Sequence, residues 1–276
     1  WKIGRLRGFF SPIPTHYIIL GYKPHRGNRT SVARTAFGAT LLSPALSRTY
    51  ALTYENGGYV PDLAGVADAL VRHGNSRFPV RLVGFPAYTY FLLRQMEARH
   101  LQVPLRPGSK ILLGGGWKQF YREAVDKEVL YGEARDRLGI PVDKPVLYDL
   151  VKRVLGLDDA DIIEVFSAVE HPILYADCVA HHFHIPIYSR AIIRDVNTLE
   201  PLPPGQVGLV NLISPLIHAT PVPSVMTDDL GVVHPGGSCS CGNPSPWLEI
   251  IGRVGLKDIQ TCAAGAAELL SGGGET

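Results

Sequence analysis

In the first half of the chain, short runs of apolar residues alternate with longer segments whose apolar residues recur at helical spacing. The short runs have the near-continuous hydrophobicity of strands that are buried on both faces of a sheet. Glycine, which favours turns, ends one of these runs at Gly21 and breaks another at Gly84. The runs predicted to be strands are residues 16–20, 79–86, 110–113 and 161–166.

The longer segments between these runs are predicted helices. Behind Pro61 and Asp62, apolar residues recur three and four positions apart as far as Val71, which is typical of a helix that begins at a proline and a capping aspartate. The β-α-β-α-β order then predicts an α/β fold with a mainly parallel sheet flanked by helices. The other predicted helices are residues 87–100, 122–138 and 144–155.

Beyond His184 the pattern changes to short β-rich segments that are separated by turns rich in glycine and proline. Such a pattern predicts antiparallel hairpins in a smaller, barrel-like β-rich region. We therefore expect an α/β region over residues 1–186 and a β-rich region over residues 187–276, with a flexible tail from about residue 271.

Composition narrows the class of protein. The chain has 276 residues, of which 46% are hydrophobic and 19% charged, so it has enough apolar material for a large buried core. The net charge is +2 and the basic residues are scattered, which gives no electrostatic reason to expect nucleic acid as a partner. No apolar run is long enough to span a membrane. A cytoplasmic enzyme or binding protein is the default expectation.

The first motif with candidate chemistry is Gly114-Gly115-Gly116-Trp117-Lys118, directly behind a predicted strand. Glycines at the carboxyl end of a parallel strand let the backbone approach a ligand closely. The alternative is an ordinary glycine-rich turn. The motif is not a typical phosphate loop, because Ser or Thr does not follow the lysine.

A second motif places Phe166 at the exit of a predicted strand and Glu170 four residues later. An aromatic ring there can stack on a base, and a carboxylate can hold Mg²⁺ against phosphate oxygens. The alternative is a core phenylalanine and a solvated glutamate.

The third motif, Thr227-x-Asp229, precedes Gly252-Arg253 by about twenty residues. An aspartate can accept hydrogen bonds from ribose hydroxyls, and an arginine can close over the same sugar. A turn and a surface charge are the alternatives for these residues.

In this order, the motifs resemble the conserved elements of the adenylate-forming enzymes. Within that superfamily the chain is most similar to the acyl-protein synthetases, which are long-chain-fatty-acid protein ligases of luminous bacteria and their non-luminous relatives. The phenylacetate-CoA ligases are next, through the shared C-x-C-Gly. The resemblance covers roughly residues 16–265 and rests on Gly84-Phe85-Pro86, residues 114–118, Glu170-His171, Cys178 with His184-x-Pro186, and Thr227-x-Asp229-Leu230-Gly231.

The resemblance implies a partial adenylate-forming large domain that uses ATP and Mg²⁺ to convert a carboxylic acid, expected to be a fatty acid, into an acyl-adenylate. It implies that Glu170 binds Mg²⁺ and also assigns residues to the nucleotide and to the acyl substrate. The nucleotide-binding positions would be Gly114, Gly115, Gly116, Phe166, Asp229 and Arg253, and the substrate-binding positions Gly84, Phe85, Trp117 and His171.

The resemblance also implies that the acyl group passes to a cysteine near the carboxyl end, and then to an acyl reductase partner. Cys262 occupies that position, although Thr261 stands where the family usually has glycine. A thiolate is a suitable nucleophile for a mixed anhydride. The alternative is an inert cysteine in an alanine-rich helix.

A second group of residues has the donor types that Zn²⁺ prefers. Cys178 and His184 are six positions apart, and Cys239 and Cys241 form a C-x-C followed by glycine. Together they predict a structural Cys₃His zinc site, with His184 favoured over His181 and His182 because it matches the His-x-Pro pattern. The alternative is four unrelated residues in an apolar setting.

Two departures from the family pattern leave other functions open. The phosphate loop of the family is expected before residue 16 and has no match, so we expect that an amino-terminal segment precedes Trp1. Too few residues follow Arg253 for the mobile domain of CoA ligases, which favours the acyl-protein synthetases. The alternatives are an acid–CoA ligase of the phenylacetate type and a non-catalytic scaffold that has lost the phosphate loop.

Overall fold

The computed structural model describes residues 2–26, 31–114, 144–168, 170–216 and 223–253. The predicted helix at 122–138, the predicted tail from residue 271, residues 115–118 and Cys262 lie outside these ranges. By their contacts, the described residues form two compact units that divide between Ile163 and Glu164. The prediction of a domain boundary at 186/187 stays a prediction.

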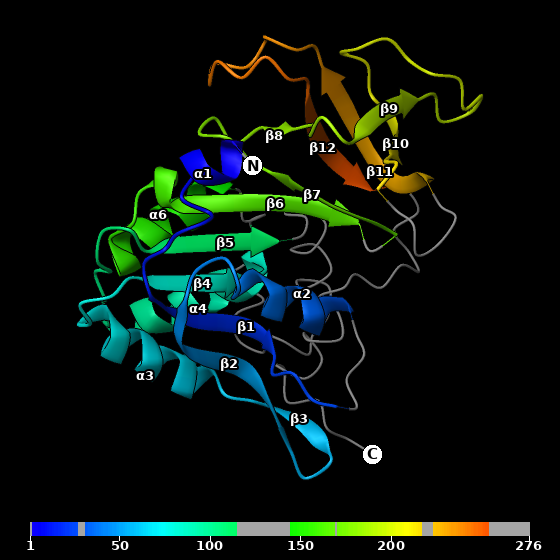
Figure 1. Cartoon of the computed structure of the whole chain (residues 1–276). Helices are drawn as coiled ribbons and strands as arrows, with labels where there is room; N and C mark the ends of the chain where they lie inside the picture. The colour runs from blue at the N-terminus through cyan, green and yellow to red at the C-terminus, as the bar shows by residue number, and fades with distance from the viewer. Residues whose placement is uncertain (1, 27–30, 115–143, 169, 217–222, 254–276) are drawn as a thin grey trace. The chain divides into compact units, whose positions relative to one another are not determined.

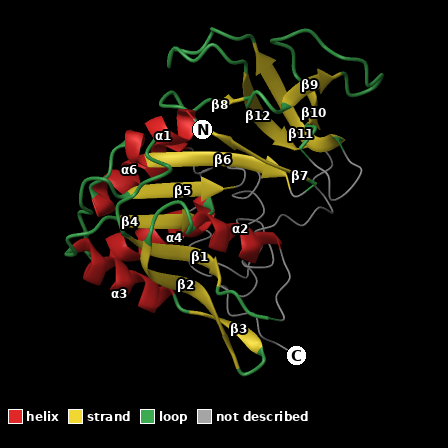
Figure 2. Ribbon diagram, in the orientation of Figure 1, coloured by secondary structure: helices red, strands yellow, loops and turns green. Residues whose placement is uncertain are grey.

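The larger sheet has the strand order β3-β2-β1-β4-β5-β6-β7 (Figures 1 and 2). Strand β1 is parallel to both β2 and β4, and β4 is parallel to β5, whereas β3 and β7 run antiparallel to β2 and β6. The mainly parallel α/β sheet that the sequence predicts is therefore confirmed. Its strands are β1 (Thr15–Tyr22), β2 (Ala45–Glu55), β3 (Gly58–Pro61), β4 (Val80–Gly84), β5 (Lys110–Gly114), β6 (Ile162–Ala168) and β7 (His171–Ala176).

Helices flank this sheet, and their ends have the expected local chemistry. Asp62 caps the first turn of α3, where its carboxylate accepts a hydrogen bond of 2.8 Å from the Gly65 amide. Pro86 stands in the first turn of α4, where its missing N–H costs nothing. The helices are α1 (Lys2–Leu6), α2 (Ser31–Ala39), α3 (Leu63–Gly74), α4 (Pro86–Ala98) and α6 (Lys144–Leu155), with a 3₁₀ turn η2 (Asp159–Asp161).

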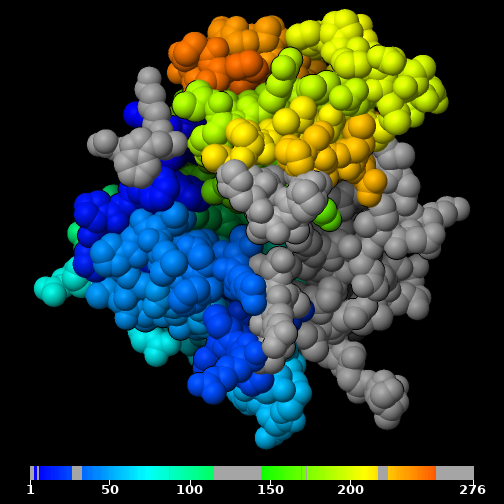
Figure 3. Space-filling model, turned by 45° about the vertical axis from the view of Figure 1, so that its right-hand side comes forward, coloured from blue at the N-terminus to red at the C-terminus, as the bar shows by residue number. Residues whose placement is uncertain are grey.

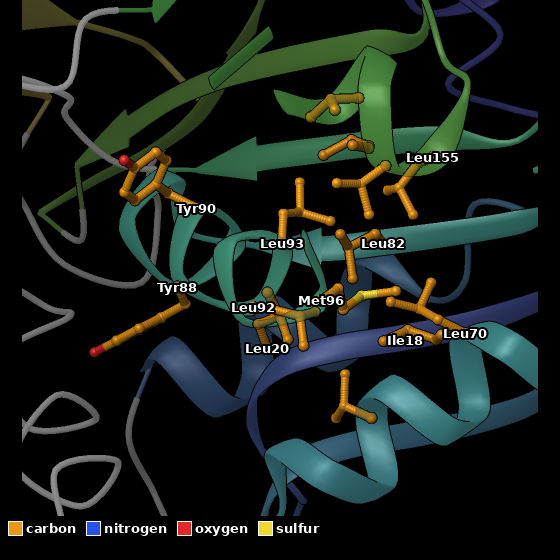
Figure 4. Packing of buried hydrophobic residues seen from close by; sticks show 14 of the residues in the cluster. Ile18, Leu20, Leu70, Leu82, Tyr88, Tyr90, Leu92, Leu93, Met96 and Leu155 are labelled. Atoms are coloured by element: carbon orange, nitrogen blue, oxygen red, sulfur yellow. The ribbon is translucent and has the colours of Figure 1, made fainter. Parts of the chain in front are cut away.

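One large apolar core lies between the helices and the strands of the first unit. In Figure 4, Leu93 and Met96 of α4 point toward Leu82 of β4, and Leu155 of α6 and Leu70 of α3 lie in the same cluster. All five side chains are buried, because the apolar face of each helix covers the sheet. None of the helices in the described ranges is long and apolar enough to cross a bilayer.

The second unit contains a five-stranded antiparallel sheet with the order β8-β12-β11-β10-β9 (Figure 1). The antiparallel β-rich region expected beyond His184 is thus present. A smaller apolar cluster, including Tyr175, Val210 and Leu248, packs on it. The strands are β8 (Phe183–His184), β9 (Arg190–Arg194), β10 (Gly208–Ile213), β11 (Ser224–His234) and β12 (Trp247–Arg253).

Candidate metal centre and nucleotide-binding residues

Two segments of the second unit bring four sulfur and nitrogen donors together. The first is the 177–184 hairpin, which follows β7 and ends in β8, and the second is the 235–246 loop between β11 and β12. Pairing of β12 with β8 sets Trp247 opposite His184 and so joins the two segments. The 235–246 loop, orange in Figure 3, lies largely at the surface of this unit.

The donor atoms of Cys178, His184, Cys239 and Cys241 all lie within 4.8 Å of one another. The Sγ atoms of Cys178 and Cys239 are 3.7 Å apart, and Nε2 of His184 is 3.2 Å from Sγ of Cys241. A disulfide needs about 2.05 Å between its sulfurs. The three cysteines are free thiols, and except for Cys241 the four residues are buried.

Backbone amides point at two of the sulfurs. The amide of Ala180 donates to Sγ of Cys178, and the amide of Asn243 donates to Sγ of Cys241, each over 3.4 Å. Both bonds span two residues, so each cysteine starts a tight loop that curls back over its own sulfur. The bond from Asn243 favours the thiolate of Cys241, which is the metal-binding form of cysteine.

A residue with positive φ closes a backbone turn in each segment. The first has His181 at φ 55°, whose amide donates to the Cys178 carbonyl over 2.9 Å, and the second has Gly242 at φ 75°, whose amide donates to the Cys239 carbonyl over 3.1 Å. Glycine adopts this conformation freely, which explains why the C-x-C is followed by glycine. The imidazole of His181 is turned to Asp177, with Nδ1 2.6 Å from Oδ2, and so it does not join the four donors.

The imidazole of His184 is oriented for binding through Nε2. Its Nδ1 is 3.0 Å from the Ser245 carbonyl oxygen, which can only accept a hydrogen bond, so the ring proton lies on Nδ1 and the lone pair of Nε2 faces the thiol of Cys241. Burial lowers the pKa of His184, although the bond to Ser245 works in the opposite direction. The ring is therefore neutral at physiological pH, as a metal ligand must be.

The thiols are packed too closely to ionise together without a compensating cation. Burial, with the neighbouring Cys241 and Cys178 thiols, raises the pKa of Cys239 to about 12. Burial is the largest single influence on Cys241 and opposes its ionisation, but the hydrogen bonds from the Asn243 amide and from the Cys239 and Cys178 thiols together lower the pKa of this thiol. One thiolate is thus favoured at the expense of its neighbours, because like charges at this distance repel.

An aromatic stack lies beside the four donors. Trp247 is sandwiched between the imidazoles of His182 and His234, with ring centroids 3.7 Å apart on both faces. Nδ1 of His182 is 3.2 Å from Sγ of Cys239, and the indole N–H of Trp247 donates to Ser238. Sequence reasoning missed this stack, because nothing in the spacing of these residues predicts that they meet.

The predicted ribose-binding residues occupy neighbouring strands. Asp229 in β11 and Arg253 in β12 are directly opposite each other in the antiparallel register. The Asp229 side chain is buried, and its backbone amide bonds to the hydroxyl of Thr227 over 3.2 Å. Residues that are far apart in the sequence are thereby brought together at one position of the sheet, while their nucleotide-binding role stays a prediction.

Phe166 and Glu170 belong to the hairpin formed by β6 and β7. Phe166 is partly buried, with its ring 5.8 Å from that of Tyr175 and 6.1 Å from that of Phe183. Glu170 lies at the turn and is exposed to solvent. An exposed carboxylate at a turn is free to bind a cation, so the arrangement is compatible with the predicted magnesium role.

His171, next to this glutamate, is completely buried. The hydroxyl of Ser189 donates its proton to the Ile213 carbonyl. The Tyr175 hydroxyl, which lies 2.5 Å from the Ser189 oxygen, therefore donates to Ser189. The same Tyr175 oxygen accepts a hydrogen bond from Nε2 of His171 over 3.3 Å. The ring proton is therefore on Nε2, and Nδ1 is a buried acceptor without a partner among the described residues. Burial lowers the pKa of His171, which keeps the ring neutral. Its substrate-binding role stays a prediction.

The other predicted site residues that the structure describes belong to the first unit. Gly84 ends β4, and a Cβ atom there would lie 2.8 Å from Cβ of Leu20, so only glycine fits without a shift. Phe85 precedes α4 and packs against the core, and Gly114 ends β5. The predictions for Gly115, Gly116, Trp117 and Cys262 lie outside the described residues.

Comparison with known proteins identifies the family of the chain. The family model described as "Acyl-protein synthetase, LuxE" matches residues 7–271. Long-chain-fatty-acid–luciferin-component ligases are 24% identical to the chain over 208 residues in Aliivibrio fischeri and 25% identical over 185 residues in Vibrio harveyi. These matches cover 73% and 66% of the chain, which spans 48% and 43% of the two relatives.

Solved structures share the fold at low sequence identity. A 2-hydroxyisobutyryl-CoA ligase in the postadenylation state matches with a TM-score of 0.59 and 16% identity, over 91% of this chain and 46% of its own. A long-chain-fatty-acid-CoA ligase of Archaeoglobus fulgidus matches with a TM-score of 0.52 and 10% identity, over 87% and 44%. At this identity the likeness concerns the fold alone.

Proposed function

The chain belongs to the acyl-protein synthetase family, and from this premise we propose that it takes part in the ATP-dependent activation of a fatty acid and its transfer to a protein cysteine. The observation that carries the proposal is the family match over residues 7–271. The position of Asp229 opposite Arg253 supports it, because one sugar can contact residues on two adjacent strands.

The proposed reaction has two steps. A carboxylate oxygen of the fatty acid attacks the α-phosphorus of ATP, and the bond to the β-phosphate oxygen breaks, which releases pyrophosphate. The thiolate of Cys262 then attacks the acyl carbonyl carbon, and AMP leaves as the thioester forms. Neither step needs a redox partner. Catalysis of the first step consists mainly of positioning and charge neutralisation.

Each polar residue has a proposed task. Asp229 accepts hydrogen bonds from the ribose hydroxyls, with Arg253 beside it, and Glu170 binds the Mg²⁺ that neutralises the phosphates. Phe166 lies against the base, and the glycines 114–116 flank the adenine and the acyl carboxylate. Gly84, Phe85, Trp117 and His171 are proposed to contact the acyl substrate.

The partner and the location are further proposals. The chain spans about half the length of the two curated relatives, so the activity of the whole protein is inferred from the family. We propose an acyl reductase as the protein that receives the acyl group from Cys262, and the cytoplasm as the compartment.

The test is acid-dependent exchange of labelled pyrophosphate into ATP by the full-length protein. Asp229→Asn is expected to raise the KM for ATP about ten- to hundredfold, because a charge-assisted hydrogen bond contributes about 1.5–3 kcal/mol. Asp228→Asn is the matched control, since Asp228 is the exposed neighbour on the same strand. Exchange that requires no acid, or equal KM values for both variants, would refute the proposal. Acyl-CoA in place of acyl-protein would favour an acid–CoA ligase.

A further inference from the structure

All four donors of the second unit lie within 4.8 Å of one another, and two of the donor pairs have about the spacing of a tetrahedral zinc site. With a Zn–S bond of about 2.3 Å, two thiolates of one tetrahedron lie about 3.8 Å apart. The Sγ atoms of Cys178 and Cys239 are 3.7 Å apart. A sulfur and a nitrogen of the same tetrahedron lie about 3.5 Å apart. Sγ of Cys241 and Nε2 of His184 are 3.2 Å apart.

The chemistry of the donors selects the metal. Three thiols and a neutral imidazole are soft or borderline ligands, which suit Zn²⁺ and exclude the oxygen-seeking cations Mg²⁺ and Ca²⁺. Four protein donors complete a tetrahedron and leave no open position for water or substrate. This is the composition of a structural site rather than a catalytic one.

The surroundings of the donors fit the same function. The Ser245 carbonyl fixes the ring orientation of His184, and the amides of Ala180 and Asn243 donate to two of the sulfurs. His182, held against Trp247, lies beside the third sulfur, that of Cys239. Metal sites in proteins have such supporting hydrogen bonds around their ligands.

We propose that Cys178, His184, Cys239 and Cys241 bind one structural Zn²⁺ that fastens the 177–184 hairpin to the 235–246 loop. Strand β8 has only two residues, and although Phe183 packs against the apolar cluster, most of the 235–246 loop is exposed, so the loop gains little stability from apolar burial. Bound zinc supplies this missing stabilisation and neutralises the clustered thiolates. The inference is independent of acyl activation, since it concerns no residue assigned to that reaction.

The experiment measures the metal content of the full-length protein, purified without added metal, by elemental mass spectrometry. About one zinc per chain is expected. Cys241→Ser is expected to lose most of the metal, whereas Cys262→Ser, the matched cysteine outside the cluster, is expected to keep it. Metal-free wild-type protein, iron in place of zinc, or unchanged zinc in Cys241→Ser would overturn the proposal.

A second measurement does not depend on the folding of any variant. Wild-type protein grown with Co²⁺ is expected to show the visible bands of tetrahedral Co²⁺ and the near-ultraviolet band of thiolate-to-cobalt charge transfer. An octahedral cobalt spectrum without the thiolate band would contradict the proposal. Because neither measurement contains ATP or fatty acid, its failure is distinct from a failure of the proposed function.

Discussion

Each of the two units of the chain has its own source of stability. The first packs its helices against a mainly parallel sheet around one large apolar core, part of which is drawn in Figure 4. The second has a smaller apolar cluster, and in it a short hairpin and a surface loop bring sulfur and nitrogen donors together. Hydrophobic burial stabilises the stacked layers of the first unit, whereas the proposed zinc site would stabilise the two loops of the second.

The largest effect on stability is expected from a cavity in the core of the first unit. Leu93 is fully buried in the middle of the core, so Leu93→Ala is expected to lower the free energy of unfolding by about 2–5 kcal/mol. Denaturant unfolding measures this loss. The control is Leu41→Ala at a residue that is 65% exposed, where little change is expected. A loss below about 1 kcal/mol in Leu93→Ala would show that this core is loosely packed.

A local effect is expected in the second unit. Cys241→Ser removes one of the four proposed zinc ligands. Amide hydrogen exchange should therefore accelerate about tenfold or more in the 177–184 hairpin and the 235–246 loop. Helix α3 of the first unit, whose core is intact, should exchange as before. Equal acceleration in α3 and in the two loops would mean that the units do not differ in the way described.

The smallest expected effect is a loss of folding stability at acidic pH. His16 and His73 stack with ring centroids 3.9 Å apart in the first unit, and burial lowers the pKa of both, with His16 contributing further to His73. The unfolded chain then binds protons more readily than the folded chain just below the ordinary pKa of about 6.5. Stability should therefore fall as the pH drops through 6.5, and level off below the folded pKa values.

Variants locate this pH dependence. His73→Gln is expected to weaken it, as measured by the denaturation midpoint at pH 7.5 and at pH 5. His100→Asn serves as the control, since His100 is exposed and its positive φ of 55° is one that asparagine tolerates. An unchanged pH dependence in His73→Gln would assign the effect to other groups.

Much of the fold could be predicted because strands buried on both faces are almost continuously apolar. Residues 16–20 fall within β1, and the predicted helix at 144–155 coincides with α6. Strands β2 and β3 were missed, since β2 mixes exposed and buried positions. The signal was Asn56-Gly57, whose φ angles of 50° and 91° suit a two-residue hairpin turn.

The candidate metal site could likewise be predicted only in part from the sequence. Residue types and spacing singled out Cys178, His184, Cys239 and Cys241, because few side chains are good donors to soft metals. The stack of His182 on Trp247 could not be predicted, since it depends on the pairing of β12 with β8. A strand register between distant segments is decided by packing, which no single stretch of sequence reveals.

The central claim is that this chain accepts an activated acyl group on Cys262, while its other cysteines serve the structure. The most direct measurement is peptide mass spectrometry of the full-length protein after incubation with ATP, Mg²⁺ and a long-chain fatty acid. The account predicts an acyl thioester on the Cys262 peptide and none on Cys178, Cys239 or Cys241. Acylation of any of those three, or no acylated cysteine although acid-dependent pyrophosphate exchange proceeds, would contradict it.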